Sequence, residues 1–536
     1  MKTIKILSLS VLATALFYGC GSTAGILSTP IENIDTSPLK VSDLTENEKH
    51  TWGHLDLVKD TIPGMSVEKA YTELIKNKKG KTVIVAVIDS GIDIDHEDLN
   101  DVIWTNKGEI PNNGKDDDKN GYIDDIHGWN FLGDGYDEQL EYVRILASGD
   151  TNNPDYLKAQ AEYDKEYQKY TGYKTNYEQI LQQITSADDV LTKHFDKSDY
   201  TKAEVNAIKT EDEALTQAVQ VAKYMYSNDM DSLSDAKKEI ENGLESINDR
   251  LNYNLNKTFK GRINGDNPDD MSTKFYGNGN VKPVKKTESH GTHVAGIIAA
   301  ERNNGKGANG VANNVEIMCV RTVPNGDEYD KDVALAIRYA VDNGAKIING
   351  SFGKYYSPHS DWVRDAIAYA GQNDVLFVNA AGNEGANIDT TNVYPNDAVG
   401  VGPEVSNTFI TVGALEPKYG SSMIAGFSNY GKVNVDVFAP GAKVYSTTPE
   451  NEYDTKGGTS MAAPAVAGVA ALIRSYYPKL SAAQVKQILL DSGLAINTKV
   501  IVGGDTNNVK SFANLVKSSK MVNAYNALIM AAKITN

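Results

Sequence analysis

Cysteine is nearly absent from this 536-residue chain, which carries only Cys20 and Cys319. We expect Cys20 to become the modified N-terminus of the mature chain, so no disulfide bond can form within that chain. Cys319 falls in the apolar run 315–320. Because free cysteine is commonly buried, this run predicts a structural thiol and not a catalytic one.

An excess of positive charge is also missing. Lys and Arg number 53 against 71 Asp and Glu, which gives a net charge of -18. That balance argues against binding nucleic acid through its phosphates.

The apolar run 6–18 is too short to span a bilayer comfortably, and it follows the basic Lys2 and Lys5.

Residues 1–20 are therefore predicted to be a signal peptide of the lipoprotein type. The four residues before Cys20 are Leu16, Phe17, Tyr18 and Gly19, and they resemble a relaxed lipobox with a bulky residue at Tyr18. Lipidation of Cys20 would tether the mature protein to a bacterial membrane on its extracytoplasmic side, either in the periplasm or at the cell surface. An ordinary cleaved secretory signal, with Cys20 incidental, is the alternative interpretation.

Three further segments follow the signal. Residues 21–80 are predicted to be a flexible tether and then an extension that packs on the main domain. Residues 81–536 form that domain, and residues 134–262 interrupt it with a Lys-, Glu- and Tyr-rich stretch of helical spacing. This helical insertion either decorates the surface, or it gates the active site, binds a partner or keeps the protein latent.

Strands and helices alternate in the main domain. The apolar run 83–88 predicts a strand buried on both faces, and similar runs recur at 315–320, 345–348, 375–380 and 409–412. Helical stretches lie between several of them, so we predict an α/β fold with a mainly parallel sheet. Ligands bind at the carboxyl ends of such strands, where Asp89, residues 351–353 and Asn383 fall.

Three motifs carry candidate chemistry. Asp89-Ser90-Gly91 follows the first strand, His290 opens a helix of small residues, and Ser460 begins an apolar helix after two glycines. A serine is a weak nucleophile that needs a base and an orienting acid. Together these motifs resemble the subtilisin-like serine peptidases, the subtilases, over residues 81–133 and 275–495.

The resemblance implies a subtilisin-like three-layer fold and peptide-bond hydrolysis without a catalytic metal or organic cofactor. Ser460 would be the nucleophile, His290 the general base and Asp89 the residue that orients it. Asn383 would donate to the oxyanion. Ser351, Phe352 and Gly353 would pair with an extended protein or peptide substrate. The oligomeric state is left open.

A second chemical signal is an aspartate-rich loop. Asp116, Asp118, Asn120, the carbonyl of Tyr122 and Asp124 match the first nine positions of an EF-hand-type calcium loop. Position twelve is His127 in place of glutamate, so the site must borrow a ligand, for which Asp125 is a candidate. Subtilases often bind structural calcium, and a polar turn without metal is the alternative.

Two rival functions come from other classes. A non-catalytic surface lipoprotein could use the helical insertion as its binding module, but the complete set of three motifs argues against it. A lipase or esterase would need a Gly-x-Ser-x-Gly elbow and a histidine after the serine. The stretch around Ser460 lacks the second glycine, and no histidine follows it.

Overall fold

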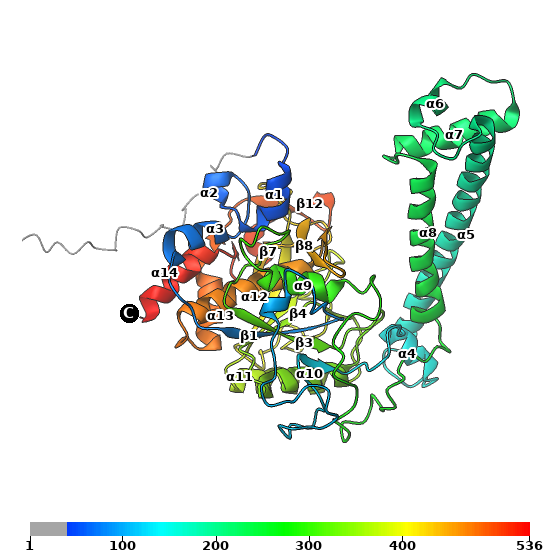
Figure 1. The fold of residues 1–536 in the computed structure, drawn as a ribbon. Helices are drawn as coiled ribbons and strands as arrows, with labels where there is room; N and C mark the ends of the chain where they lie inside the picture. Colours follow the sequence, from blue (N-terminus) through cyan, green and yellow to red (C-terminus); the bar gives the residue numbers. More distant parts are fainter. Residues whose placement is uncertain (1–39, 536) are drawn as a thin grey trace, which may run out of the picture.

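A computed structural model describes residues 40–535 (Figure 1). The predicted signal peptide, Cys20 and most of the predicted tether lie outside these residues. Within residues 40–535, no helix combines the length and the apolar character needed to cross a membrane.

A nine-stranded sheet forms the centre of the described chain, in the order β10-β13-β7-β6-β5-β4-β1-β3-β2. All neighbours pair in parallel except β10 and β13. The strands are β1 (Val83–Asp89), β2 (Gly128–Asn130), β3 (Val315–Arg321), β4 (Ile347–Gly350), β5 (Leu376–Ala380), β6 (Phe409–Leu415), β7 (Val437–Pro440), β10 (Leu494–Ala495) and β13 (Lys520–Met521). The predicted mainly parallel sheet is confirmed.

Helices cover both faces of the sheet. Alternate residues of β1 face opposite sides, so they pack against different sets of helices. Val85 and Val87 pack in one buried cluster with α9 (His290–Ala299), α12 (Thr459–Tyr476), α13 (Ala482–Ser492) and α14 (Ala524–Thr535). Ala86 and Ile88 pack in a second cluster with α10 (Asp330–Asp342) and α11 (Ser360–Gln372). The predicted three-layer α/β architecture is therefore confirmed.

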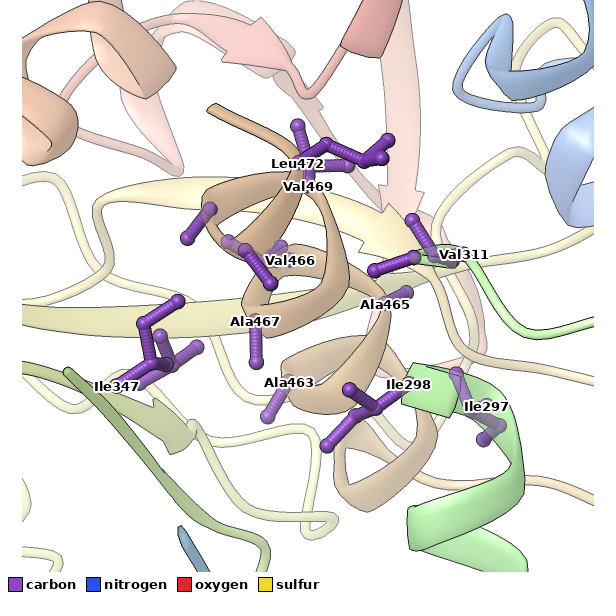
Figure 2. Close-up of a cluster of buried hydrophobic side chains, with 14 of the residues drawn as sticks. Ile297, Ile298, Val311, Ile347, Ala463, Ala465, Val466, Ala467, Val469 and Leu472 are labelled. Carbon is purple, nitrogen blue, oxygen red and sulfur yellow. The ribbon is translucent and has the colours of Figure 1, made fainter. Parts of the chain in front are cut away.

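Helix α12 runs through the largest cluster, and every residue from 461 to 475 is buried. Figure 2 shows its small side chains packed against Ile297 and Ile298 of α9 and Ile347 of β4. At Gly468 the helix approaches Val311 so closely that an added Cβ would lie 2.5 Å from the valine Cβ. The six alanines of α12, together with Gly468, thus let the helix pack closely between the sheet and the neighbouring helices.

The helical insertion forms a long arm that projects from the body of the molecule (Figure 1). We call residues 141–254 the helical arm. It contains α4 (Glu141–Ala147), α5 (Tyr156–Phe195), α6 (Lys202–Ala207), α7 (Glu213–Ser227), α8 (Leu233–Asp249) and the π-helical turn Arg250–Asn254. The 40 residues of α5 are about 60 Å long at 1.5 Å per residue. The outer end of the arm has its own apolar cluster, which includes Leu191 and Ala222.

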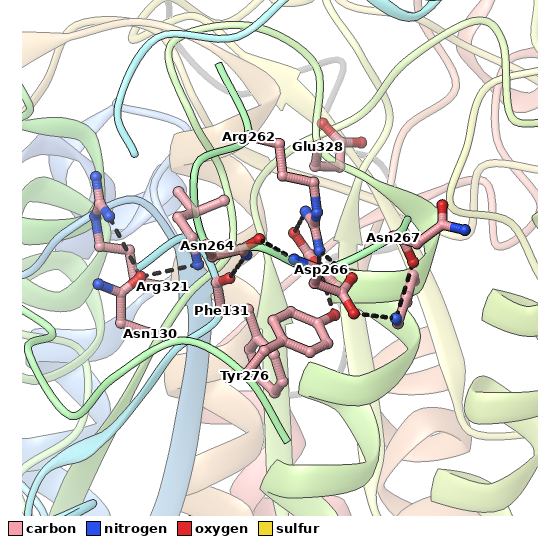
Figure 3. A network of polar contacts seen from close by, with 12 residues as sticks. Asn130, Phe131, Arg262, Asn264, Asp266, Asn267, Tyr276, Arg321 and Glu328 are labelled. Atoms are coloured by element: carbon pink, nitrogen blue, oxygen red, sulfur yellow. Dashed lines mark hydrogen bonds and ion pairs between the residues drawn. The ribbon is translucent and has the colours of Figure 1, made fainter. Parts of the chain in front are cut away.

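The chain that leaves the arm is fixed to the main domain by Arg262. Its guanidinium donates to both carboxylate oxygens of Asp332 on α10, each at 2.9 Å, and to Asp266 at 2.8 Å (Figure 3). Asp332 is fully buried, so this fork is a desolvated ion pair. The return of the chain is therefore set by specific contacts on α10.

The remaining short elements belong to the N-terminal extension and to two hairpins. Trp52, in the N-terminal extension, is buried and donates its indole N–H to the carbonyl of Lys443 at 2.9 Å. The extension contains α1 (Glu46–Thr51), α2 (Leu57–Asp60) and α3 (Val67–Lys69). Two hairpins complete the described chain, β8 (Val444–Thr448) with β9 (Glu452–Lys456) and β11 (Lys499–Val502) with β12 (Asp505–Ser511).

Candidate active site

The end of β1 and the start of α9 bring Asp89 and His290 together. His290 Nδ1 lies 2.7 Å from Asp89 Oδ1, which also accepts the N–H of Ser90 at 2.7 Å. The Ser90 hydroxyl accepts the N–H of Gly291 at 3.0 Å, which ties the first turn of α9 to the end of β1. The Asp89 carboxylate is fully buried, so it holds the ring in a fixed orientation.

The pKa of His290 is raised above its ordinary value. Burial alone would lower it, but the charge of Asp89 and the hydrogen bond to it outweigh that effect, while Lys456 works in the lowering direction. The His290 side chain remains 39% exposed, which limits the loss of hydration. The raised pKa makes the imidazole a stronger base than an unperturbed histidine, which suits it to take the proton of a nucleophile.

A buried ion pair lies next to the segments that carry Asp89 and His290. Arg321 Nε donates to Glu288 Oε1 at 2.7 Å, and both side chains are 2% exposed or less. Glu288 Oε1 also accepts the N–H of Gly91 at 2.8 Å, so it connects the segments that carry Asp89 and His290. The Arg321 fork reaches further, to Asn130 (Figure 3). It also donates to the carbonyls of residues 133 and 135.

Ser460 and Ser351 are joined by two reciprocal hydrogen bonds. The Ser460 hydroxyl donates to the carbonyl of Ser351 at 3.0 Å, and the Ser351 hydroxyl donates to the carbonyl of Ser460 at 2.8 Å. In a regular helix the second carbonyl would accept the N–H four residues on, but that residue is Pro464, which has none. Pro464 therefore frees the carbonyl that fixes Ser460 to the segment after β4.

Asn383 lies just beyond the end of β5, next to Ser460. Its Oδ1 accepts two hydrogen bonds from Thr459, from the N–H at 2.8 Å and from the hydroxyl at 3.0 Å. With the oxygen so occupied, the amide group directs its Nδ2 away from Thr459. An added Cβ on Gly458 would lie 3.6 Å from that nitrogen. The Nδ2 donor thus lies beside the turn that leads into Ser460.

A cleft of about 460 Å³ lies beside Asp89 and His290, and Ser460 and Asn383 are not among the residues that line it. Its lining includes Asp89, His290, Lys456 and residues 323–328 and 351–353. The structure thus brings the predicted Ser351, Phe352 and Gly353 into the cleft with the dyad. Among the described residues, none between 137 and 286 lines this cleft, so the helical arm does not cover it.

The second histidine of the motif, His293, has a structural position. It is fully buried, its Nε2 lies 3.1 Å from the carbonyl of Asp454 on β9, and burial lowers its pKa to about 3. Cys319 is likewise buried within β3, as predicted, and burial raises the pKa of its thiol. Neither group is placed to react with a substrate in the cleft.

The model of the Subtilase family matches residues 80–515, which is most of the chain. The chain belongs to the subtilase family. Subtilisin DY of Bacillus licheniformis is 36% identical over 225 residues, which cover 42% of this chain and 77% of that protein. Thermitase of Thermoactinomyces vulgaris is 39% identical over 208 residues, 39% of this chain and 65% of thermitase.

A longer relative is matched over a smaller share of its length. The thermophilic serine proteinase of Bacillus sp. strain AK1 is 44% identical over 188 residues, which cover 35% of this subtilase and 43% of that relative. This subtilase therefore spans less than half of that protein. The aligned shares of this chain stay below one half, as expected for a domain interrupted by a long insertion.

The aspartate-rich loop of this subtilase gathers a cluster of oxygen donors. Carboxylate oxygens of Glu109, Asp118 and Asp125 lie within 4.8 Å of one another, and burial raises the pKa of Asp125 to about 6. The Asn106 amide bridges Asp118 and Asp125, at 2.9 Å from each. Hard cations such as Ca²⁺ prefer this all-oxygen donor set, so the residues fit a structural calcium ion.

The other predicted ligands serve the loop itself. Asp116 accepts the N–H groups of Asn120 and Gly121, Asp124 accepts those of Asn113 and Gly114, and the Asn120 side chain accepts the N–H of Tyr122. Of the predicted ligands, Asp118 lies in the acidic cluster, together with Asp125, the candidate for the borrowed ligand. Glu109 was not predicted, because it precedes the loop and only the folded turn brings it close.

Proposed function

We propose that this subtilase is a serine endopeptidase that hydrolyses peptide bonds in proteins through an acyl-enzyme. Asp89, His290 and Ser460 are its triad, and Asn383 is its oxyanion donor. The observation that carries the proposal is the 2.7 Å contact between His290 Nδ1 and buried Asp89 in a cleft whose wall, at Ser351, holds the Ser460 hydroxyl.

Each step uses one of these groups. The Ser460 hydroxyl attacks the carbonyl carbon of the scissile bond while His290 Nε2 takes its proton. The negative charge that forms on the substrate oxygen is stabilised by Asn383 Nδ2 and by the Ser460 N–H. His290 then gives its proton to the leaving amine, and a water molecule, activated by the same imidazole, releases the acyl group.

The relation to subtilisin DY, thermitase and the serine proteinase of Bacillus sp. strain AK1 supports this reaction class. The cleft has room for an extended peptide, and residues 351–353 offer main-chain groups for strand pairing along one wall. Substrates are therefore expected to be proteins or peptides in extended conformation.

A fluorophosphonate probe tests the nucleophile directly. The wild-type protein should be labelled at Ser460, and Ser460→Ala should be unlabelled and slower on peptides by roughly six orders of magnitude. Asp89→Asn should be labelled poorly, because it presents the wrong tautomer of His290. A folded wild-type protein that takes no label and cleaves no member of a peptide library would refute the proposal.

We also propose that calcium stabilises the aspartate-rich loop through Asp118, Asp125 and Glu109. The support is a buried carboxylate at Asp125 whose desolvation a bound cation would offset. Removing calcium should lower the melting temperature of the wild-type protein but leave Asp118→Asn unchanged. Equal melting temperatures of the wild type with and without calcium would contradict this role.

The N-terminal sequence supports an extracytoplasmic, lipid-anchored protein with Cys20 as the modified residue. Growth with a clickable fatty acid should label the wild-type protein, and Cys20→Ala should abolish the label. A wild type that is exported without label would leave the ordinary secretory signal as the better interpretation.

A further inference from the structure

One wall of the cleft is attached to the base of the helical arm. This cleft wall, residues 325–328, exchanges main-chain hydrogen bonds with the chain that enters the arm. The Asn325 N–H donates to Tyr136 at 2.8 Å, the Glu138 N–H donates to Asn325 at 3.0 Å, and the Asp327 N–H donates to Gln139 at 3.3 Å. An added Cβ on Gly326 would lie 2.2 Å from the Glu138 carbonyl oxygen.

Two side chains of the arm itself complete this attachment. Arg144 of α4 donates to the carbonyl of Asp327 at 2.9 Å and to that of Glu328 at 3.2 Å. Asn254, where the arm ends, donates to the carbonyl of Asn325 at 2.8 Å. Both ends of the arm thus hold main-chain oxygens of the same short wall.

A buried cation joins this assembly to the segment 351–353, which also lines the cleft. Lys354 directly follows Gly353 and is fully enclosed, with its side chain 2% exposed. Its ammonium donates to the carbonyl of Glu328 at 2.7 Å and to Glu141 of α4 at 2.8 Å. Burial by itself would raise the pKa of Glu141, but the charges of Arg144 and Lys354 bring it down to about 2. Glu141 is therefore a fixed anion between the two cations.

We propose that the base of the helical arm sets the width and shape of the substrate cleft, with Arg144 and Glu141 as positioning residues that act through the main chain of residues 325–328. The arm itself points away from the body (Figure 1), so it acts on the cleft through its base and not as a cover.

This inference rests on the proposed peptidase function. Two substrates of different length show whether the role of the arm base or the peptidase function itself is wrong. A small N-acyl amino acid ester reaches Ser460 without contact along the walls, whereas a peptide of about eight residues lies between them. A wall held loosely should impair only the longer substrate, because misplacement by about 1 Å can cost up to roughly 100-fold in rate.

The test compares Arg144→Met with Arg338→Met. Both arginines lie over a tyrosine ring, at 4.0 Å from Tyr329 and 4.8 Å from Tyr369, but Arg338 is on the outer helix α10 and away from the cleft. Arg144→Met should lower kcat/KM on the long peptide roughly tenfold or more and leave the short ester within about twofold. Arg338→Met should match the wild type on both substrates.

Further variants keep the result interpretable. Glu141→Gln conserves side-chain size and should likewise lower kcat/KM on the long peptide, which gives a second test if Arg144→Met does not fold. Arg144→Lys should recover only part of the lost kcat/KM, because lysine lacks the forked guanidinium. Equal losses on the ester and the peptide, or no loss on either, would overturn the proposal. A wild-type protein without ester hydrolysis or probe labelling would instead refute the peptidase function.

Discussion

Removing the Arg321 guanidinium should destabilise the protein strongly, and Arg321→Met is the substitution of choice because it keeps an unbranched apolar stem. The change removes the 2.7 Å contact to Glu288 and three further hydrogen bonds in a site where both charged side chains are almost fully buried. Leaving one member of a buried ion pair unpaired costs about 3–5 kcal/mol. For a domain of this size that corresponds to a drop of roughly 3–7 °C in melting temperature.

Catalysis should fall as well, because Glu288 is an anchor for both halves of the dyad. Its Oε1 accepts the N–H of Gly91, two residues after Asp89, and it lies two residues before His290. Without Arg321 the Glu288 carboxylate is expected to shift toward water, and the distance between Asp89 and His290 is then no longer fixed on both sides. We therefore expect a lower kcat on any substrate, short or long.

Equilibrium unfolding in urea, followed by tryptophan fluorescence, measures the loss of stability. The variants should be made in the Ser460→Ala background, so that an unfolded fraction is not digested. Glu288→Gln and the double variant complete a thermodynamic cycle, and the double variant should lose less than the sum of the single losses by about 1–3 kcal/mol. A loss below about 1 kcal/mol for Arg321→Met, or strictly additive single losses, would refute the reasoning.

Three other outcomes follow from the structure. The kcat/KM of the wild-type protein should decline as pH falls through the pKa of His290, with a midpoint above the usual 6.5 because Asp89 favours the protonated imidazole. Lys456→Gln should move this midpoint higher, because it removes a positive charge that lowers the pKa of His290. A pH profile of Lys456→Gln equal to that of the wild type would exclude an effect of Lys456. Asn383→Ala should lower kcat by about 10²–10³, the range found for such a donor in a related enzyme, with little change in KM; an equal rise in KM would indicate a binding role. Leu191→Ala, in the fully buried cluster at the outer end of the arm, should cost about 2–5 kcal/mol locally, seen as faster hydrogen exchange in α5 and α7, while peptide hydrolysis stays at the wild-type rate.

Local patterns were sufficient for much of the fold. The run 83–88 became β1 with one residue added, and the apolar helix expected to begin at Ser460 became α12, which begins one residue earlier at Thr459. Both segments are uniformly apolar and bounded by polar residues or glycine, so their ends are visible in the sequence. The capping boxes at Thr201 and Ser481 are equally local features, since a cap involves residues only three apart.

Contacts between distant segments could not be obtained in this way. Glu288 has no periodicity or motif that points to Arg321, 33 residues later, and their pairing depends on the register of β1 beside β3. The position of the arm is a similar case. Its helical spacing predicted helices, but the choice between covering the cleft and projecting from the body depends on side chains at its base. Arg144 is an example, because two of its carbonyl partners lie more than 180 residues away.

The two ends of the arm also bear on how the chain folds. Strand β1 must pair with β3, whose residues lie 232 positions further along the chain. The arm accounts for about half of that distance, and the Leu140 N–H bonds the Asn254 carbonyl at 3.1 Å, so a folded arm brings the chain back to where it left. If α5, α7 and α8 form first from their local contacts, the loop that β1 and β3 must close is halved, which lowers the entropic cost of closure by about 0.6 kcal/mol. The arm separates β1 from β3 in the sequence, but once folded it makes their pairing less costly in chain entropy.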